Sequence, residues 1–163
     1  MRILALDPSL NCFGWAVLDY NESDESFYLV DKGVIHNKII PAKLPGKKLH
    51  RIRKKLQDIC SKYEFQAVVR EASFVTKRIK SSERTFMVIG IVVETLHECG
   101  YSDIQEVSAT TVKKVVGGDG KCSKEEVRAN LDYFVGRQEY ETEDESDAVA
   151  VGITYVSKIN TEK

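Results

Sequence analysis

The fold is decided by RILALDP at residues 2–8, followed by FGWAVLDY at residues 13–20 and FYLVDKGVI at residues 27–35. The first run is almost continuously apolar up to the Asp7-Pro8 turn, which is typical of a strand buried on both faces. The two later runs are separated by NESDES at residues 21–26, whose polar, turn-forming residues suit a hairpin. The chain is therefore predicted to open with three antiparallel strands, the first of which ends on a carboxylate.

The remaining pattern alternates between helical and strand-like segments. After Pro45-Gly46, one helical stripe is formed by Leu49, Ile52, Leu56, Ile59 and Tyr63. A strand at residues 67–69 runs into Arg70-Glu71, a helix is expected at 86–96, and a further strand at 104–107. Three helical segments follow: one capped by Ser108 or Thr110, and two that begin with capping-box patterns at Ser123 and Thr142. This order predicts an α/β fold with a mixed five-stranded sheet flanked by helices.

Length and composition indicate one globular domain spanning residues 1–163. The chain is 42% hydrophobic and 30% charged, which is not the composition of a disordered, fibrous or membrane protein. The cysteines lie far apart without zinc-ligand spacing, so we interpret them as free thiols in a reducing compartment: Cys12, Cys60, Cys99 and Cys122. No apolar stretch approaches the roughly 20 residues needed to span a bilayer, and a cytoplasmic location is expected.

The charge is distributed unevenly along the chain. Residues 43–84 contain thirteen Lys/Arg against four Asp/Glu, a net charge of +9, so the rest of the chain carries −10. Such a block indicates a polyanionic partner, because neutralisation of phosphates by Lys and Arg supplies most of the non-specific affinity for nucleic acid. On charge alone, a solvated helix face explains the block equally well.

Four acidic residues are the candidates for chemistry. Asp7 and Glu71 end the first and fourth predicted strands, and Asp144 and Asp147 lie three residues apart at the start of the last helix. Taken singly, each has a structural explanation: a turn for Asp7, a surface strand end for Glu71, and helix capping for the final pair. Together they form a set of hard oxygen donors that suits Mg²⁺ or Mn²⁺. Two such ions would support phosphodiester hydrolysis.

The motifs around these acids resemble the RuvC-type Holliday junction resolvases. The resemblance is carried by ILALDPS at 3–9 with GWAV at 14–17, by EASF at 71–74 and by DESDAVA at 144–150. A further stretch, VKKVVG at 112–117 followed by KEEV at 124–127, is similar to the family segment that places two lysines near the scissile phosphate. The resemblance implies that Lys113 and Lys124 have this role and that Phe74 faces DNA. It also implies an RNase H-like fold, a homodimer with two active sites, and paired nicks across a four-way junction.

Two features depart from the family pattern. Ser9 stands where many cellular members have glycine, and it is closer to bacteriophage-type members. The stretch between Phe74 and Gly90 is longer and basic; its candidate DNA-binding residues are Lys77, Arg78, Lys80 and Arg84. These residues are predicted to contact the phosphates of a duplex arm, and residues 75–85 are predicted to form a mobile loop that orders on DNA.

The leading hypothesis is a magnesium-dependent endonuclease that resolves Holliday junctions, with two ions bound by the four acids in each active site. One alternative is an RNase H-like nuclease that acts on flaps, forks or RNA, because metal chemistry does not select the substrate. Another is a non-catalytic module that binds branched DNA. A nucleotide-binding protein of the actin-like superfamily is disfavoured, because the chain is too short for two lobes. The sequence does not indicate whether a motor protein is a partner.

Overall fold

A five-stranded mixed sheet forms the centre of the protein. The computed structural model describes residues 1–73 and 79–161, with only the backbone at residues 79 and 80. The strands are β1 (Arg2–Asp7), β2 (Cys12–Asn21), β3 (Ser26–His36), β4 (Ala67–Glu71) and β5 (Ile104–Val107), in the order β3-β2-β1-β4-β5. The first three are antiparallel, whereas β4 runs parallel to both β1 and β5. The prediction of a mixed five-stranded α/β sheet is confirmed.

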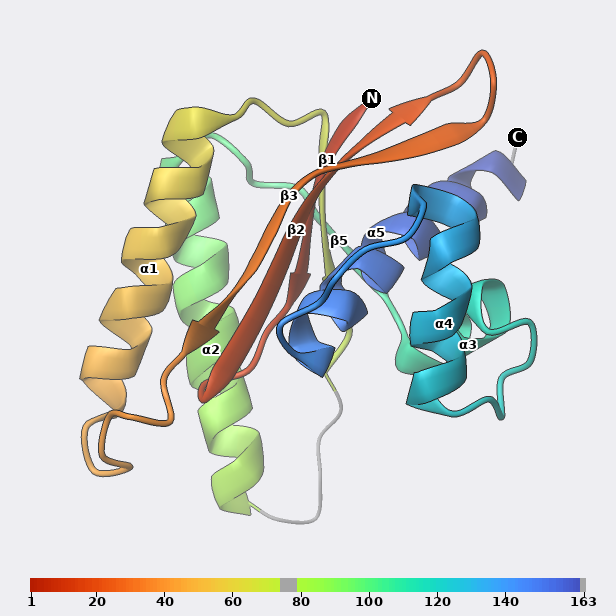
Figure 1. The fold of residues 1–163 in the computed structure, drawn as a ribbon. Coiled ribbons are helices and arrows are strands. Elements are labelled where there is room, and N and C mark those ends of the chain that lie inside the picture. The colour runs from red at the N-terminus through yellow and green to blue at the C-terminus, as the bar shows by residue number, and fades with distance from the viewer. Residues whose placement is uncertain (74–78, 162–163) are drawn as a thin grey trace.

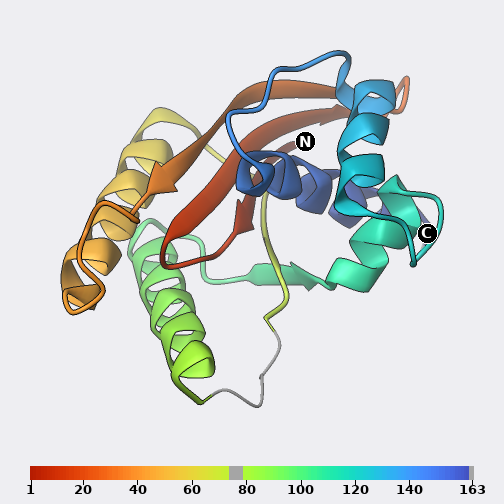
Figure 2. The ribbon, with the colours of Figure 1, turned by 60° about the horizontal axis from the view of Figure 1, so that its bottom comes forward.

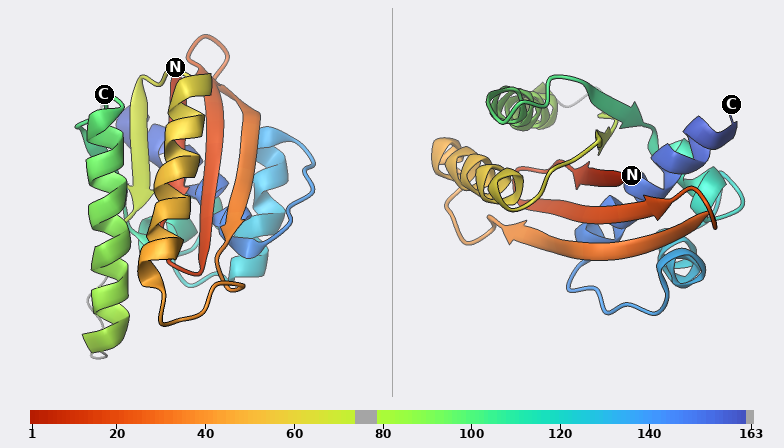
Figure 3. Two further views of the ribbon diagram at one scale, coloured as in Figure 1. Left: turned by 90° about the vertical axis from the view of Figure 1, so that its left-hand side faces the viewer. Right: turned by 90° about the horizontal axis from the view of Figure 1, so that it is seen from above.

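Helices cover both faces of this sheet (Figure 1). One face carries α1 (Pro45–Lys62) and α2 (Ile79–Glu98), which lie side by side. The other carries α3 (Ala109–Val116), α4 (Lys124–Val135) and α5 (Glu143–Thr161), with α5 directly against the strands (Figure 3). None of the helices in the described ranges is long and apolar enough to cross a membrane.

Strand β1 lies between two hydrophobic cores, which explains its continuous apolar sequence. Ile3 and Ala5 belong to the core beneath α5, whereas Leu4 and Leu6 belong to the core beneath α1 and α2. All four side chains are fully buried. Burial of each larger side chain contributes about 1.5–3 kcal/mol, so β1 is fixed in place on both sides and its last residue, Asp7, is held rigidly.

Helix α5 is buried far more completely than one amphipathic stripe requires. Val149, Ile153 and Val156, which lie on or near one side of the helix, are buried, and so are the small residues between them. The close approach depends on Gly152, where an added Cβ would lie 2.5 Å from Cδ1 of Leu18. Because no side chain separates the helix from β2 at this point, α5 packs directly on the sheet.

The predicted helix starts are largely correct. Ser108 caps α3 by accepting a hydrogen bond from the backbone N–H of Thr111. Ser123 and Glu126 form the predicted capping box of α4. At Thr142 the predicted box is only half formed: the Thr142 hydroxyl accepts from the N–H of Glu145, but the Glu145 carboxylate accepts from the N–H of Glu141 instead.

The start of α2 corrects the predicted loop. Residues 79–85 are the first two turns of α2, and the hydroxyl of Thr85 donates to the carbonyl of Ser81 within the helix. The sequence pattern failed here because Ser82, a polar residue, occupies a buried position in the first turns of the helix. A stripe of apolar residues therefore begins later than the helix itself. Residues 74–78 of the predicted loop lie outside the described residues.

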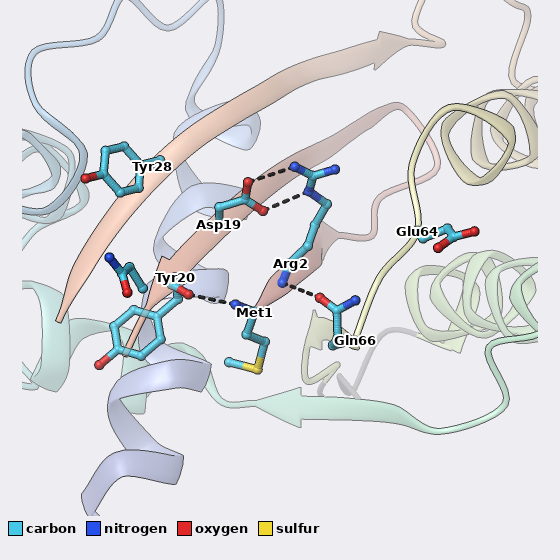
Figure 4. Close-up of a pocket in the computed structure, with 8 residues that line it drawn as sticks. Met1, Arg2, Asp19, Tyr20, Tyr28, Glu64 and Gln66 are labelled. Carbon is cyan, nitrogen blue, oxygen red and sulfur yellow. Dashed lines mark hydrogen bonds and ion pairs between the residues drawn. The ribbon is translucent and has the colours of Figure 1, made fainter. Parts of the chain in front are cut away.

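The beginning of β1 is closed by polar contacts at the opposite end of the strand from Asp7 (Figure 4). Arg2 forms a bidentate ion pair with Asp19, at 2.8 Å for each hydrogen bond. The N-terminal amine donates to the carbonyl of Tyr20, and the N–H of Arg2 donates to the side chain of Gln66. These contacts fix the register of β1 against β2, and the register in turn fixes which residues face Asp7.

Candidate active site

Asp7 and Glu71 meet at the carboxyl ends of adjacent parallel strands. Leu6 is paired with Arg70 across β1 and β4, so the two acids follow at the next position of each strand. Their side chains are hydrogen-bonded to each other. Burial raises the pKa of Asp7 well above its usual range, and the charges of Glu71, Asp147 and Asp144 raise it further. Without a cation, both carboxyl groups therefore favour the protonated form more than an isolated carboxyl group does.

Asp144 is brought to Asp7 across a glycine. Gly14 is the β2 partner of Asp7, and an added Cβ at Gly14 would lie 1.9 Å from the carbonyl oxygen of Asp144. The start of α5 therefore rests directly on the strand beside Asp7. Asp147 follows three residues later and is half-buried. Burial raises its pKa, and the charges of Asp144 and Glu143 add to this effect.

The two predicted lysines lie beside the acids. The ammonium of Lys124 is 2.6 Å from Oδ2 of Asp147, and this ion pair opposes the rise of the Asp147 pKa. Lys113 and Lys124 line a hollow of about 50 Å³ together with Glu71 and Asp147. The structure thus brings the four acids and two lysines to one end of the sheet, the end that faces forward in Figure 2.

The donor set is suited to a hard divalent cation. Asp7, Glu71 and Asp147 all have raised pKa values, first because of burial and then because of the charges of nearby carboxylates. A bound cation would offset both the burial of these carboxylates and the repulsion between their charges. Carboxylate oxygens are also the ligands that Mg²⁺ prefers. Within residues 1–73 and 79–161, no three His, Cys, Asp or Glu side chains are already arranged as a metal-binding cluster. Asp7 instead faces Glu71, and Asp147 faces Lys124.

A buried ion pair anchors the start of α5, and sequence reasoning missed it. The ammonium of Lys32 on β3 lies 2.9 Å from Oε2 of Glu145, whose side chain is only 4% exposed. The same oxygen accepts the N–H of Glu141 at 2.8 Å. Because Glu145 lies between the two α5 acids, this pair holds their segment against the sheet. No sequence signal linked Lys32 to Glu145, which are 113 residues apart.

Comparison with known proteins identifies the family of the chain. Residues 3–155 match the family described as "Crossover junction endodeoxyribonuclease RuvC". The chain belongs to the RuvC family. A RuvC from Ehrlichia ruminantium (strain Gardel) is 35% identical over 162 residues, covering 98% of each chain. The RuvC of Xanthobacter autotrophicus is 32% identical over 95% of this chain and 89% of its own. Members of this family are endonucleases by description, as the sequence predicted.

Solved RuvC structures share the fold. "T. thermophilus RuvC in complex with Holliday junction substrate" has a TM-score of 0.84 at 18% identity, covering 99% of this chain and 96% of that one. The fowlpox virus Holliday junction resolvase has a TM-score of 0.59 at 12% identity, covering 98% and 99%. At these identities the likeness concerns the fold, and it confirms the prediction of an RNase H-like fold.

Further DNA-contact predictions concern Phe74 and the basic stretch that follows it. Arg84 is exposed on α2. Phe74, Lys77 and Arg78 lie outside the described residues, and the side chain of Lys80 does as well. Their contact with DNA therefore stays a prediction.

Proposed function

We propose that this RuvC-family chain, as a single nuclease domain, is a Mg²⁺-dependent endodeoxyribonuclease that resolves Holliday junctions by paired symmetric nicks. The observation that carries the proposal is the convergence of Asp7, Glu71, Asp144 and Asp147 at one end of the sheet. Lys113 and Lys124 lie beside them, so the site combines anionic ligands for cations with cations for a phosphate. Action on DNA suits the cytoplasmic location expected from the sequence.

In this mechanism Asp7, Glu71, Asp144 and Asp147 would hold two Mg²⁺ ions, or Mn²⁺ in their place. When bound, the ions supply Lewis-acid activation of water and charge stabilisation at the leaving 3′-oxygen. A bound cation would favour the charged forms of Asp7 and Glu71, whose pKa values are otherwise raised. Lys124, which pairs with Asp147, and Lys113, which lines the same hollow, would lie where they could contact a phosphate oxygen. The lysines would then stabilise the charge that develops on the phosphate.

The direct test is nicking of a fixed four-way junction, followed on denaturing gels with and without Mg²⁺. We expect symmetric nicks in opposite strands that require the metal. Asp7→Asn removes a ligand without altering the basic surface, so it should bind the junction and lose nicking by about 10²–10³-fold, as expected when one preorganised electrostatic group is removed. Asp132→Asn is the control, because Asp132 is exposed on α4.

Three outcomes would change the proposal. Normal turnover by Asp7→Asn would refute the assignment of the acids. Faster cleavage of flaps, forks or RNA in competition with the junction would leave the chemistry intact and replace the substrate. Tight binding to junctions without any metal-dependent nick would make the chain a branched-DNA-binding module.

The proposed dimer is supported by an apolar face of α2. Phe86 is 54% exposed and Val93 is 44% exposed, and the two are seven residues apart on one helical face. Gly90 lies between them, and an added Cβ there would meet no atom within 4 Å. A second copy that packs on this face would bury both side chains. It would also supply a second active site for the second nick, and two-fold association is the commonest symmetry of soluble oligomers.

Phe86→Glu tests the dimer by placing a charge in this apolar face. We expect the variant to sediment as a monomer and to nick one strand at a time, because a buried unpaired carboxylate costs several kcal/mol. Tyr133→Glu is the control, since Tyr133 is 88% exposed on α4, away from this face. A Phe86→Glu protein that remains dimeric would show that the copies associate elsewhere.

A further inference from the structure

The outer side of α1 carries a row of cations that the proposed active site does not use. Lys47, Arg51 and Lys54 are exposed there and follow the helical spacing i, i+4, i+7. Lys55 continues the row, half-buried, with its ammonium 4.7 Å from the centre of the Trp15 ring. The row borders a groove of about 330 Å³ between α1 and β3.

The same helix has other cations, but those are neutralised or buried within the fold. Arg53 pairs with Glu94 and Glu98 of α2 at 2.6 and 2.5 Å. Lys62 pairs with Asp31, and buried Lys48 donates to the side chain of Asn11. These cations therefore serve contacts within the fold rather than the outer row.

The row itself has no such compensation. Among residues 1–73 and 79–161, no carboxylate lies within 4.0 Å of the charged groups of Lys47, Arg51, Lys54 or Lys55. Arg51 donates only to the backbone carbonyl of His36. Asp58 is the single acid that lines the groove. The positive potential of this side of α1 is therefore directed toward solvent.

The row begins at the catalytic end of the sheet. The turn after Asp7 is tied to α1, because the Asn37 side chain donates to the carbonyls of both Leu10 and Lys48. Figure 2 shows this end, with the β1–β2 turn and the first turns of α1 facing forward. From Lys47 to Lys55 the row is about 12 Å long at 1.5 Å per residue. Duplex DNA presents about seven phosphate charges over that length, at one per 1.7 Å.

We propose that this row on α1 binds the phosphate backbone of a duplex DNA arm while the acids act at the branch point. The proposal rests on the proposed nuclease function for its choice of DNA as the polyanion. A rigid helix holds the cations about one turn apart without loss of backbone entropy on binding, so the contact would be tight without being sequence-specific. It would add affinity and orientation rather than chemistry.

The test compares two triple variants of equal net charge. Lys47→Gln/Arg51→Gln/Lys54→Gln removes the row, and Arg53→Gln/Lys62→Gln/Arg137→Gln removes three cations elsewhere, so both change the formal charge from −1 to −4. Binding of a labelled four-way junction and of a 30-base-pair duplex is measured in EDTA between 50 and 250 mM KCl. Circular dichroism confirms that each variant is folded.

The salt dependence gives the decisive readout. Each lost phosphate contact lowers the slope of log K against log[salt] by about 0.9, so the row variant should lose about 2–3 units and bind at least about 10-fold more weakly. The control should keep its slope within about half a unit. Lys54→Gln alone should lose about one unit, which tests the row in a minimally altered protein.

The two proposals fail in different ways. If the row variant keeps the wild-type slope while the wild type nicks junctions, the α1 proposal is wrong and the nuclease proposal stands. If the wild type never nicks but its binding depends on the row, the α1 proposal stands alone. With Mg²⁺ and saturating protein, the row variant should nick at the wild-type single-turnover rate. A slower rate would mean that the row acts in catalysis and would overturn its assignment as a binding surface.

Discussion

Replacement of Lys32 by methionine should destabilise the protein and displace the candidate metal ligands on α5. The Lys32–Glu145 pair is buried, with side-chain exposures of 22% and 4%. Methionine retains the apolar stem of the lysine and removes only its charge. The buried Glu145 carboxylate would then have only the hydrogen bond from the N–H of Glu141 to stabilise its negative charge. In a region of low dielectric, a charge with so few partners is costly.

The size of the effect follows from this environment. Loss of one partner of a fully buried pair costs about 3–5 kcal/mol. Lys32 is partly exposed and Glu145 keeps one donor, so we expect about 2–3 kcal/mol, which for a chain of this size corresponds to a loss of roughly 5–10 °C in Tm. A displacement of the ligands by 1 Å can slow catalysis by about 10²-fold, so nicking should fall further than the stability loss explains.

Urea denaturation and single-turnover nicking at several Mg²⁺ concentrations measure the two effects. Lys62→Met is the matched control, because Lys62 also forms an ion pair at 2.9 Å, with Asp31 on β3. Unlike that of Lys32, however, the side chain of Lys62 is 63% exposed. Exposed pairs contribute little to stability. Lys32→Met/Glu145→Met should recover most of the lost stability, because an apolar pair replaces the unpaired charge. A Lys32→Met protein no less stable than Lys62→Met would refute the reasoning.

Two further predictions concern the contact between Asp7, Gly14 and Asp144. Gly14→Ala places a Cβ 1.9 Å from the carbonyl oxygen of Asp144, so α5 must shift. We expect the free energy of unfolding in urea titrations to fall by about 1–3 kcal/mol and Mg²⁺ to activate nicking less. Gly46→Ala, whose Cβ meets no atom within 4 Å, should change neither. The raised pKa of Asp7 means that its stabilising protonated form is lost as pH rises from about 4 through the folded-state pKa. Asp7→Asn should therefore have a higher Tm than the wild type in EDTA at pH 8, whereas the control Asp132→Asn should not, and Mg²⁺ should raise the Tm of the wild type and of the control but not that of Asp7→Asn. Equal Tm values for Asp7→Asn and the wild type would contradict the proposed repulsion.

The strands were predictable because their signals are local. Leu4 and Ile3 are buried on opposite faces of β1, and a strand buried on both faces produces a continuous apolar run that needs no knowledge of its neighbours. The α2 start was not predictable by the same rule. Ser82 is buried where an apolar residue would be expected, so the apolar periodicity of the sequence begins several residues after the helix itself begins.

The acids show a different limit. Each of Asp7, Glu71 and Asp144 has a local explanation, and their proximity depends on strand register and on the passage of α5 over Gly14. The family motifs indicated this proximity indirectly, because they contain the acids in the same order along the chain as the family does. The Lys32–Glu145 pair belongs to no such motif, and it emerges only from the packing of β3 against α5.

The basic block required the structure for its interpretation. From the sequence, its charge favoured a solvated helix face and a polyanion-binding surface equally. The fold divides the block, because Arg53 is neutralised by α2 and Arg70 by Glu106 of β5, so these cations stabilise the protein itself. Lys47 and Lys54 have no such partner among the described residues, and they lie on the helix that Asn37 ties to the turn after Asp7. Net charge therefore overstated the number of cations available to DNA, and the proposed α1 surface is one part of the block that the described residues leave uncompensated.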